Sequence, residues 1–280
     1  MCEKYRFKEL KEEATISYHQ YGADVTKQMA RYEYKFEITH EQFQELINSI
    51  SDVDCRIHFL KITKFFTSSK SQVEENYDSR LKKMFFRDFF STALVNEEGV
   101  TTKTLSSKED TLYHENKMTW QIQLVFFNEV IKNFIASHQL TPEDFTELLY
   151  DELLYKNRKQ TLTTAIKALY DKDYITMCYI CTPLIENALR QLLFQCDHTI
   201  YEENKHDGFE NITLTKILSK LDEYLKDDIM FHFKFILNEK AGLNLRNEIS
   251  HGLLKDSNLT QSNSYTLLHV LMVLKLIVGF

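Results

Sequence analysis

Residues 243–252 read LNLRNEISHG, which places an arginine, an asparagine and a histidine within six positions. In a helix, at about 100° per residue, the apolar side chains of this region fall on one stripe, formed by Leu245, Ile249 and Leu253. Asn247 and His251 stack four residues apart on the opposite side. The stretch therefore predicts a helix over residues 244–255 that turns its apolar stripe to the core and its polar side chains outward.

The polar side chains of this stretch have the chemistry that handling a phosphodiester requires. Arg246 offers a planar guanidinium that matches phosphate oxygens and stays charged. His251 can accept or donate a proton, because an imidazole titrates near neutrality. Asn247 can orient either partner. Together they suit attack of an RNA 2′-hydroxyl on its neighbouring phosphate without a metal, and the alternative is a salt-bridging arginine beside a surface histidine.

The position of Arg246 in the helix bears on how a phosphate site would be completed. Asn244, at the N-cap position, would place Arg246 in the first turn of the helix, where unpaired backbone N–H groups favour an anion. Arg246 lies about 140° from His251 around the helix, so the two are not neighbours on one face. A second copy of the helix could then supply the missing part.

The segment RNEISHG at residues 246–252 resembles the signature of the HEPN superfamily. These are small helical domains in which an arginine, four to six residues and a histidine mark metal-independent endoribonucleases. The Asn directly after the Arg and the Gly directly after the His are both typical. Upstream, PLIENALR at residues 183–190 resembles the preceding helix of HEPN proteins from prokaryotic abortive-infection and related defence loci. The resemblance covers about residues 160–280, and residues 1–155 carry none.

The resemblance implies a function, a partner and a set of site residues. It implies a homodimer in which motif helices of two copies face one another, with Arg246 and His251 of both cutting RNA, Asn247 assisting and Ser250 in support. It implies no metal or other cofactor, a role in antiphage defence or as a toxin, and an antitoxin or defence-system partner. The alternative is a noncatalytic module that binds a nucleotide or RNA, or that only dimerises. Leu253 departs from one branch, which has Tyr there and acts with nucleotidyltransferase antitoxins, so that pairing is disfavoured.

Glu186 and Arg190 are four residues apart in the upstream segment. Such spacing by itself predicts an ion pair within one helix, worth a few tenths of a kcal/mol. The resemblance raises a second interpretation, in which both line the same cleft as the motif and Glu186 orients Arg246 or His251.

The composition favours a mainly α protein. The 280 residues include only 6 Gly and 2 Pro against 20 Phe and 15 Tyr, which leaves little turn chemistry. We expect a mostly helical region of unknown role over residues 1–155 and a HEPN-like helical bundle over residues 156–280. One segment of the first region, Tyr32–Ile38, alternates apolar and charged residues as a strand does. A net charge of −7 disfavours general nucleic-acid coating, so an RNA enzyme would need a local basic cleft.

The chain is expected to be cytoplasmic and not to span a membrane. Its first residues, MCEKYR, are charged and no apolar signal segment follows. The apolar run Leu267–Phe280 contains Lys275 and is short for a membrane span. Cys178 and Cys181 form a C-x-x-C that could serve zinc or redox chemistry, but their apolar surroundings favour two buried structural residues.

Several elements can be located from local signals. Thr39 and Gln42 form a capping box that opens a helix over 40–50, and Pro142 stands at the first position of another helix. The other predicted helices cover residues 120–137, 160–171, 174–195, 213–226, 229–240 and 262–278. The predicted loops cover residues 67–76, 96–110 and 197–211.

Overall fold

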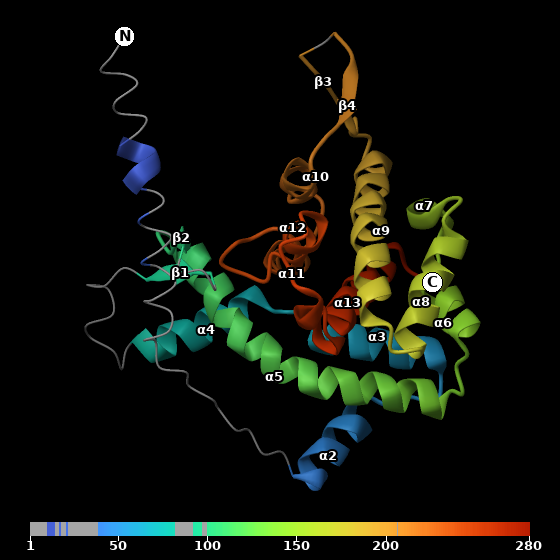
Figure 1. Ribbon diagram of the computed structural model, residues 1–280. Helices are drawn as coiled ribbons and strands as arrows, with labels where there is room; N and C mark the ends of the chain where they lie inside the picture. The colour runs from blue at the N-terminus through green and yellow to red at the C-terminus, as the bar shows by residue number, and fades with distance from the viewer. Residues whose placement is uncertain are drawn as a thin grey trace.

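The computed structural model describes residues 10–14, 17, 21, 39–81, 92–96, 100–205 and 207–280, and it is mainly helical, as predicted (Figure 1). The helices are α2 (His40–Ile50), α3 (Cys55–Phe66), α4 (Lys70–Leu81), α5 (Lys108–Ser137), α6 (Pro142–Leu149), α7 (Glu152–Tyr155), α8 (Lys159–Tyr170), α9 (Tyr174–Gln195), α10 (Leu214–Leu221), α11 (Asp227–Leu237), α12 (Leu245–Ser250), η2 (Asp256–Asn258) and α13 (Gln261–Val278). Two antiparallel hairpins complete it, β1 (Ala93–Val95) with β2 (Thr101–Thr104) and β3 (Tyr201–Glu203) with β4 (Phe209–Asn211).

Local capping chemistry fixes several helix ends. The Thr39 hydroxyl accepts the Gln42 N–H, and the Gln42 side chain accepts the Thr39 N–H, so the predicted capping box opens α2. Thr141 and Asp144 form a second box, with Pro142 at the first helical position of α6 as expected. These interactions satisfy backbone donors that a helix cannot pair internally.

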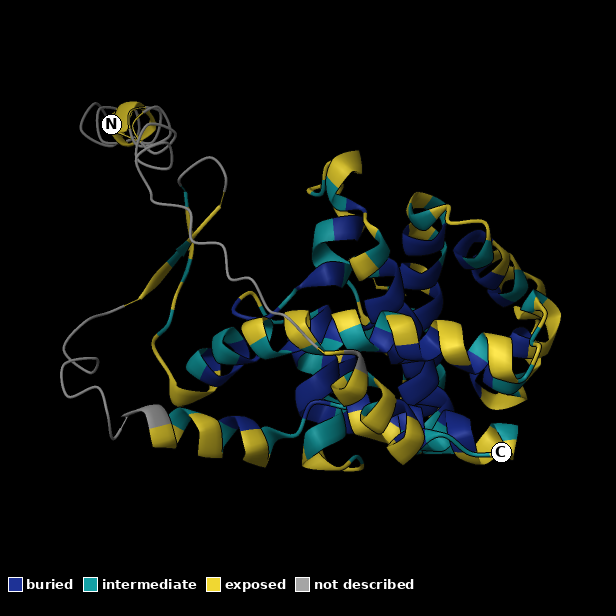
Figure 2. Ribbon diagram, turned by 90° about the horizontal axis from the view of Figure 1, so that it is seen from below, coloured by how far each residue is buried: buried dark blue, intermediate teal, exposed yellow. Residues whose placement is uncertain are grey.

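The core is one continuous set of buried side chains centred on α13. This helix is buried around almost its whole circumference and packs against α3, α5 and α9, while α5 turns its outer face to solvent (Figure 2). A helix that is apolar on all sides is stable only inside such a shell. The buried cluster runs from Ile47 to Leu274 and crosses position 155, so α3 and α5 share their core with the later helices. The boundary between residues 155 and 156 stays a prediction.

Two buried histidines bridge helices that are far apart in the sequence. The Ser68 N–H donates to His232 Nδ1 at 3.2 Å, and the His232 and His269 rings meet Nε2 to Nδ1 at 2.8 Å. His269 Nε2 lies 3.2 Å from the Thr63 carbonyl oxygen. If each neutral ring carries its proton on Nε2, both nitrogens of each ring have a hydrogen-bond partner. This row of hydrogen bonds links α11 and α13 to the end of α3 and to the segment after it.

The predicted loops and the bounds of two helices require correction. The segment predicted as a loop over 67–76 mostly belongs to α4, whose first N–H, at Lys70, donates to the Asp228 carboxylate at 2.7 Å. Residues 96–110 contain β2 and the start of α5, and residues 197–211 contain the β3–β4 hairpin, which projects from the bundle in Figure 1. Helix α10 ends at Leu221 rather than at residue 226, and α11 covers 227–237 rather than 229–240.

Two other sequence predictions concern a possible strand near the N-terminus and the absence of a membrane span. The possible strand Tyr32–Ile38 lies outside the described residues. In the part of the chain that is described, no helix combines the length and the apolar character needed to cross a membrane.

Candidate active site

Helix α12, which carries the arginine of the motif, is held against α11 by a tight turn at Gly242. A Cβ atom at this position would lie 2.2 Å from the Phe235 carbonyl oxygen, closer than any side chain tolerates. The same carbonyl accepts the Leu243 N–H at 2.8 Å. Only glycine permits this approach, and it fixes where α12 begins.

The end of α12 is set by Gly252, which has a φ of +64°. The Leu253 N–H donates to the Glu248 carbonyl at 2.9 Å, and the Gly252 N–H donates to the Ile249 carbonyl at 3.1 Å. This pair of bonds is the Schellman motif that closes a helix C-terminus. The predicted helix over 244–255 is therefore wrong in length, and Leu253 is exposed instead of completing an apolar stripe. Leu245 and Ile249 are buried as predicted.

Asn244 does not act as the expected side-chain cap. Its backbone is left-handed, with a φ of +51°, and its amide oxygen accepts the Asn247 Nδ2–H at 2.7 Å. Its own Nδ2 donates to Glu248 Oε1 at 3.0 Å. Asparagine tolerates this conformation better than most residues. Asn244 thus orients Asn247 rather than the first backbone N–H groups of α12.

Arg246 and Glu186 meet directly, although 60 positions separate them in the sequence. Arg246 Nε and Nη2 both approach Glu186 Oε2, at 2.8 and 2.7 Å, and Nη1 donates to Asn247 Oδ1 at 2.9 Å. The other Glu186 oxygen accepts Arg190 Nη2 at 2.8 Å. Glu186 therefore contacts Arg246 and also forms the ion pair with Arg190 that their spacing on α9 predicted.

The surroundings of Glu186 carry excess positive charge. Arg158 Nη2 donates to Asn187 Oδ1 at 3.3 Å, next to Glu186 on α9. Two arginines, Arg190 and Arg246, pair with the single Glu186 carboxylate, so this ion-pair group carries one positive charge in excess. Arg190 Nε is buried without a hydrogen-bond partner among the described residues. A local basic patch of this kind is what the acidic chain needs if it handles RNA.

His251 stands at the C-cap position of α12 and is exposed, and Ser250 beside it is exposed as well. Its backbone N–H donates to the Asn247 carbonyl at 3.1 Å. The side chain points away from the core, as the helical wheel predicted, but within the described residues no hydrogen bond links it to Arg246. Within one chain, Arg246 and His251 therefore lie on the same short helix but do not contact each other through a hydrogen bond.

The exposed face of α9 adds two aromatic side chains that the sequence analysis did not single out. Tyr179 and Phe194 are 45% and 55% exposed. At helical spacing they share a face with Glu186 and Arg190. Helical periodicity around Glu186 was the signal that would have found them.

Cys178 and Cys181 are buried, as predicted. Cys178 Sγ lies 3.4 Å from Ser264 Oγ, and Cys181 Sγ lies 3.4 Å from the Met177 sulfur. Burial raises the pKa of both thiols, which disfavours the thiolate that metal binding and redox exchange require. Among the described residues, no three His, Cys, Asp or Glu side chains are grouped so that they could hold a metal ion.

Comparison of the chain with models of known protein families, with curated proteins and with solved structures gave no match. The interpretation of the site therefore depends on its own residues.

Proposed function

We propose that the chain is a cytoplasmic, metal-independent endoribonuclease whose site is built on Arg246 and His251. The observation that carries the proposal is the contact of Arg246 with Glu186 and Asn247. A guanidinium has five N–H donors, and this arrangement uses three of its nitrogens while leaving further N–H groups for phosphate oxygens. Carboxylate and amide together fix the orientation of a side chain that is otherwise flexible.

The two residues have different chemical roles in this proposal. His251, exposed at the end of α12, takes the proton from the RNA 2′-hydroxyl or returns one to the leaving 5′-oxygen. Arg246 stabilises the negative charge that builds on the phosphate oxygens. The 2′-oxygen forms a bond to phosphorus as the bond to the 5′-oxygen breaks, which yields a 2′,3′-cyclic phosphate and a 5′-hydroxyl. Asn247 holds the guanidinium, Arg190 balances Glu186, and Ser250 stays a supporting candidate beside the histidine.

A second copy of the chain is the proposed partner. One chain does not join His251 to Arg246, and acid, base and charge stabilisation are three tasks for two residues. On α9, the exposed side chains of Tyr179 and Phe194 lie on either side of Glu186 and Arg190. Exposed aromatic residues together with an arginine are typical of protein–protein interfaces. We propose that two copies meet on this face and place two sets of motif residues along one RNA strand.

The test is cleavage of single-stranded RNA in the presence of EDTA. We expect products with a 2′,3′-cyclic phosphate and a 5′-hydroxyl, identified by mass spectrometry. His251→Ala and Arg246→Ala should each lower the rate by about 10²-fold or more, since each removes one catalytic contribution of that order. The matched control is His198→Ala, which removes a histidine that contacts Tyr224 outside the motif and should leave the rate unchanged. Undiminished cleavage by His251→Ala would refute the catalytic assignment.

The dimer is tested by Tyr179→Glu. Placing a like pair of charges at the interface should convert dimers to monomers in sedimentation velocity and should lower cleavage with it. Ile175→Glu, at an exposed position one turn earlier on α9, tests in the same measurement how far the interface extends along this helix. A wild-type chain that sediments as a monomer at tens of micromolar, with and without RNA, contradicts the composite site.

One specific observation favours a noncatalytic alternative. Every nitrogen of the Arg246 guanidinium already has a partner within the chain, as in a purely structural ion pair. In that case RNA binds without cleavage, and Arg246→Ala weakens binding or stability only. The proposed role in antiphage defence, as a toxin with an antitoxin or defence partner, is supported by the motif resemblance alone. Growth arrest on expression of the wild type, absent for His251→Ala, would be the expected cellular result.

A further inference from the structure

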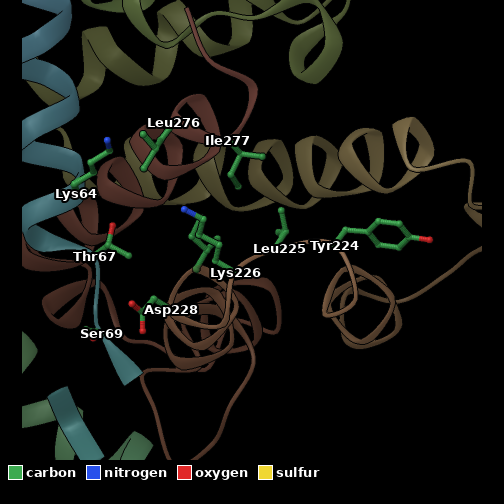
Figure 3. A pocket seen from close by; sticks show the side chains of 10 residues that line it. Lys64, Thr67, Ser69, Tyr224, Leu225, Lys226, Asp228, Leu276 and Ile277 are labelled. Carbon is green, nitrogen blue, oxygen red and sulfur yellow. The ribbon is translucent and has the colours of Figure 1, made fainter. Parts of the chain in front are cut away.

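A cavity of about 760 Å³ lies where the ends of α3, α11 and α13 meet (Figure 3). Its volume falls in the range of small-ligand sites. Residues of α3 and the segment after it form one side, and residues at the start of α11 form the other. The C-terminal turns of α13 close the remaining side with Leu276 and Ile277.

One part of the wall is cationic. Lys64 and Lys226 both line the cavity, and Figure 3 shows Lys226 reaching from its side toward Lys64 and Thr67 on the other. Among the described residues, no carboxylate lies within ion-pair distance of either ammonium group, in contrast to Lys61, whose Nζ is 2.9 Å from Asp52. Two uncompensated ammonium groups that face one cavity attract an anion.

A helix dipole and hydroxyl donors reinforce this part of the wall. Lys226 stands at the N-cap position of α11 without a capping side-chain hydrogen bond, so the positive end of the helix dipole lies at this wall, beside the acidic first turn formed by Asp227 and Asp228. Thr67 and Ser69 add hydroxyl groups. The one carboxylate in the lining, Asp228, is engaged by the Lys70 N–H at 2.7 Å, and two lysines against it leave one positive charge in excess.

A second part of the wall is aliphatic. Leu225, Ile229, Leu276 and Ile277 line it, while the Tyr224 ring points outward (Figure 3). An apolar wall next to a few placed polar groups is the usual composition of a small-molecule site. An inorganic anion would leave this wall without a partner, so the occupant needs an apolar body as well as a charge.

We propose that this cavity binds a small amphipathic anion, with a phosphate or carboxylate group held by Lys64 and Lys226 and an apolar body against Leu276 and Ile277. The site joins α3 from the first part of the chain to α11 and α13 from the second. It is independent of the proposed nuclease function, since none of its residues belongs to the Arg246 network.

The test is isothermal titration calorimetry of the full chain with three probes. Octyl phosphate represents a ligand with an alkyl chain, adenosine monophosphate a nucleotide, and inorganic phosphate the headgroup alone. We expect at least one of the first two to bind at least about 10-fold more tightly than inorganic phosphate, because each apolar group removed from water adds affinity. The probe that binds identifies the source of the ligand, and either result supports the site.

Three variants assign the binding to this cavity. Lys64→Ala with Lys226→Ala should weaken the better probe by about 10-fold or more, since both charges are lost. Ile277→Trp, at a half-buried position, should weaken it by filling the aliphatic side. Lys167→Ala, which removes an exposed lysine paired with Glu143, should change nothing. Circular dichroism and thermal melting verify that each variant is folded.

Three outcomes overturn the proposal. They are the absence of binding by both amphipathic probes below about 1 mM, inorganic phosphate binding as tightly as they do, and full affinity in the folded double-lysine variant.

Discussion

Two polar networks in this chain join helices that are distant in the sequence, and they differ in their exposure to water. The Arg246–Glu186–Arg190 network on α12 and α9 is half-buried and charged. The His232–His269 network between α3, α11 and α13 is fully buried and contains no charged partner. The first has donors left for a ligand, whereas the second has every ring nitrogen engaged within the protein.

The comparison shows that a histidine's role follows from its surroundings rather than its presence. Burial lowers the pKa of His269 to about 3, although its bond to the Thr63 carbonyl opposes the shift. Burial, reinforced by His269, also lowers the pKa of His232 well below its usual range. Both rings are therefore neutral structural groups near neutrality, while His251 at the end of α12 faces solvent.

The largest expected effect is loss of stability in acid through the buried network. Below about pH 6.5 the two histidines bind protons in the unfolded state, whereas His232 and His269 stay neutral in the folded state. The free energy of unfolding is therefore highest above this pH and decreases as the pH falls toward 3. Between about pH 7.5 and about pH 5 the depressed pKa of His269 lowers the free energy of unfolding by about 2 kcal/mol, and His232 adds a further loss in the same direction.

Urea unfolding followed at both pH values measures this loss. His251→Ala is the matched control and should show the same pH dependence as the wild type. Equal stability of the wild type at the two pH values would mean that the buried rings are not held neutral.

The second prediction removes one ring of the buried network. His269→Ala leaves His232 Nε2 and the Thr63 carbonyl without their partner and opens a cavity in the core, and we expect a loss of about 3 kcal/mol in the free energy of unfolding. Chemical denaturation at neutral pH measures it. An effect no larger than that of His251→Ala would show that the network does not stabilise the fold.

The third prediction addresses the charged network and rests on the proposed nuclease function. Glu186→Gln weakens the hold on Arg246, so cleavage should fall about 10-fold while the free energy of unfolding changes by no more than about 1 kcal/mol. Glu143→Gln, at the exposed pair with Lys167, is the control. In an Arg246→Ala background Glu186→Gln should have no further effect; additive losses would show that Glu186 acts by another route.

The smallest expected effect concerns the end of α12. Gly252→Ala forces a left-handed backbone on a residue with a Cβ, and it should cost about 1 kcal/mol of stability. No atom lies within 4 Å of the added Cβ, so crowding does not contribute. Thermal melting measures the loss. Gly252→Asn should recover part of it, because asparagine tolerates this conformation, and equal losses in both variants would argue against backbone strain as the cause.

Helix ends with local signals were predictable, and ends set by tertiary contacts were not. The box at Thr39 and Gln42 gave α2 its first residue, and the predicted range 174–195 matches α9, whose first turn Asp173 caps. Helix α4 was missed because its sequence, KSQVEENYDSRL, has almost no apolar stripe; its start is capped by Asp228 from α11. The early end of α12 had a local signal, Gly252, which the helical pattern of the leucines outweighed.

The candidate site was predictable in its members but only partly in its contacts. Spacing on α9 gave the Glu186–Arg190 pair directly. The meeting of Glu186 with Arg246 depends on how α12 packs on α9, which no spacing within either helix contains. Arg158 and Asn244 were missed as parts of the polar surroundings because each acts through an amide, Asn187 or Asn247, rather than through a charge pair.

Trp120 is the chain's only tryptophan, and it lies beside the buried histidines. Its ring centroid is 5.2 Å from that of His232 and 5.5 Å from that of His269, and its Nε1–H donates to Thr266 Oγ1 at 3.1 Å. Selective excitation of this indole therefore gives an intrinsic optical probe of one defined place. Its emission colour reports whether α5 still shields that place from water, and its intensity reports protonation of the adjacent imidazoles, without any label on the protein.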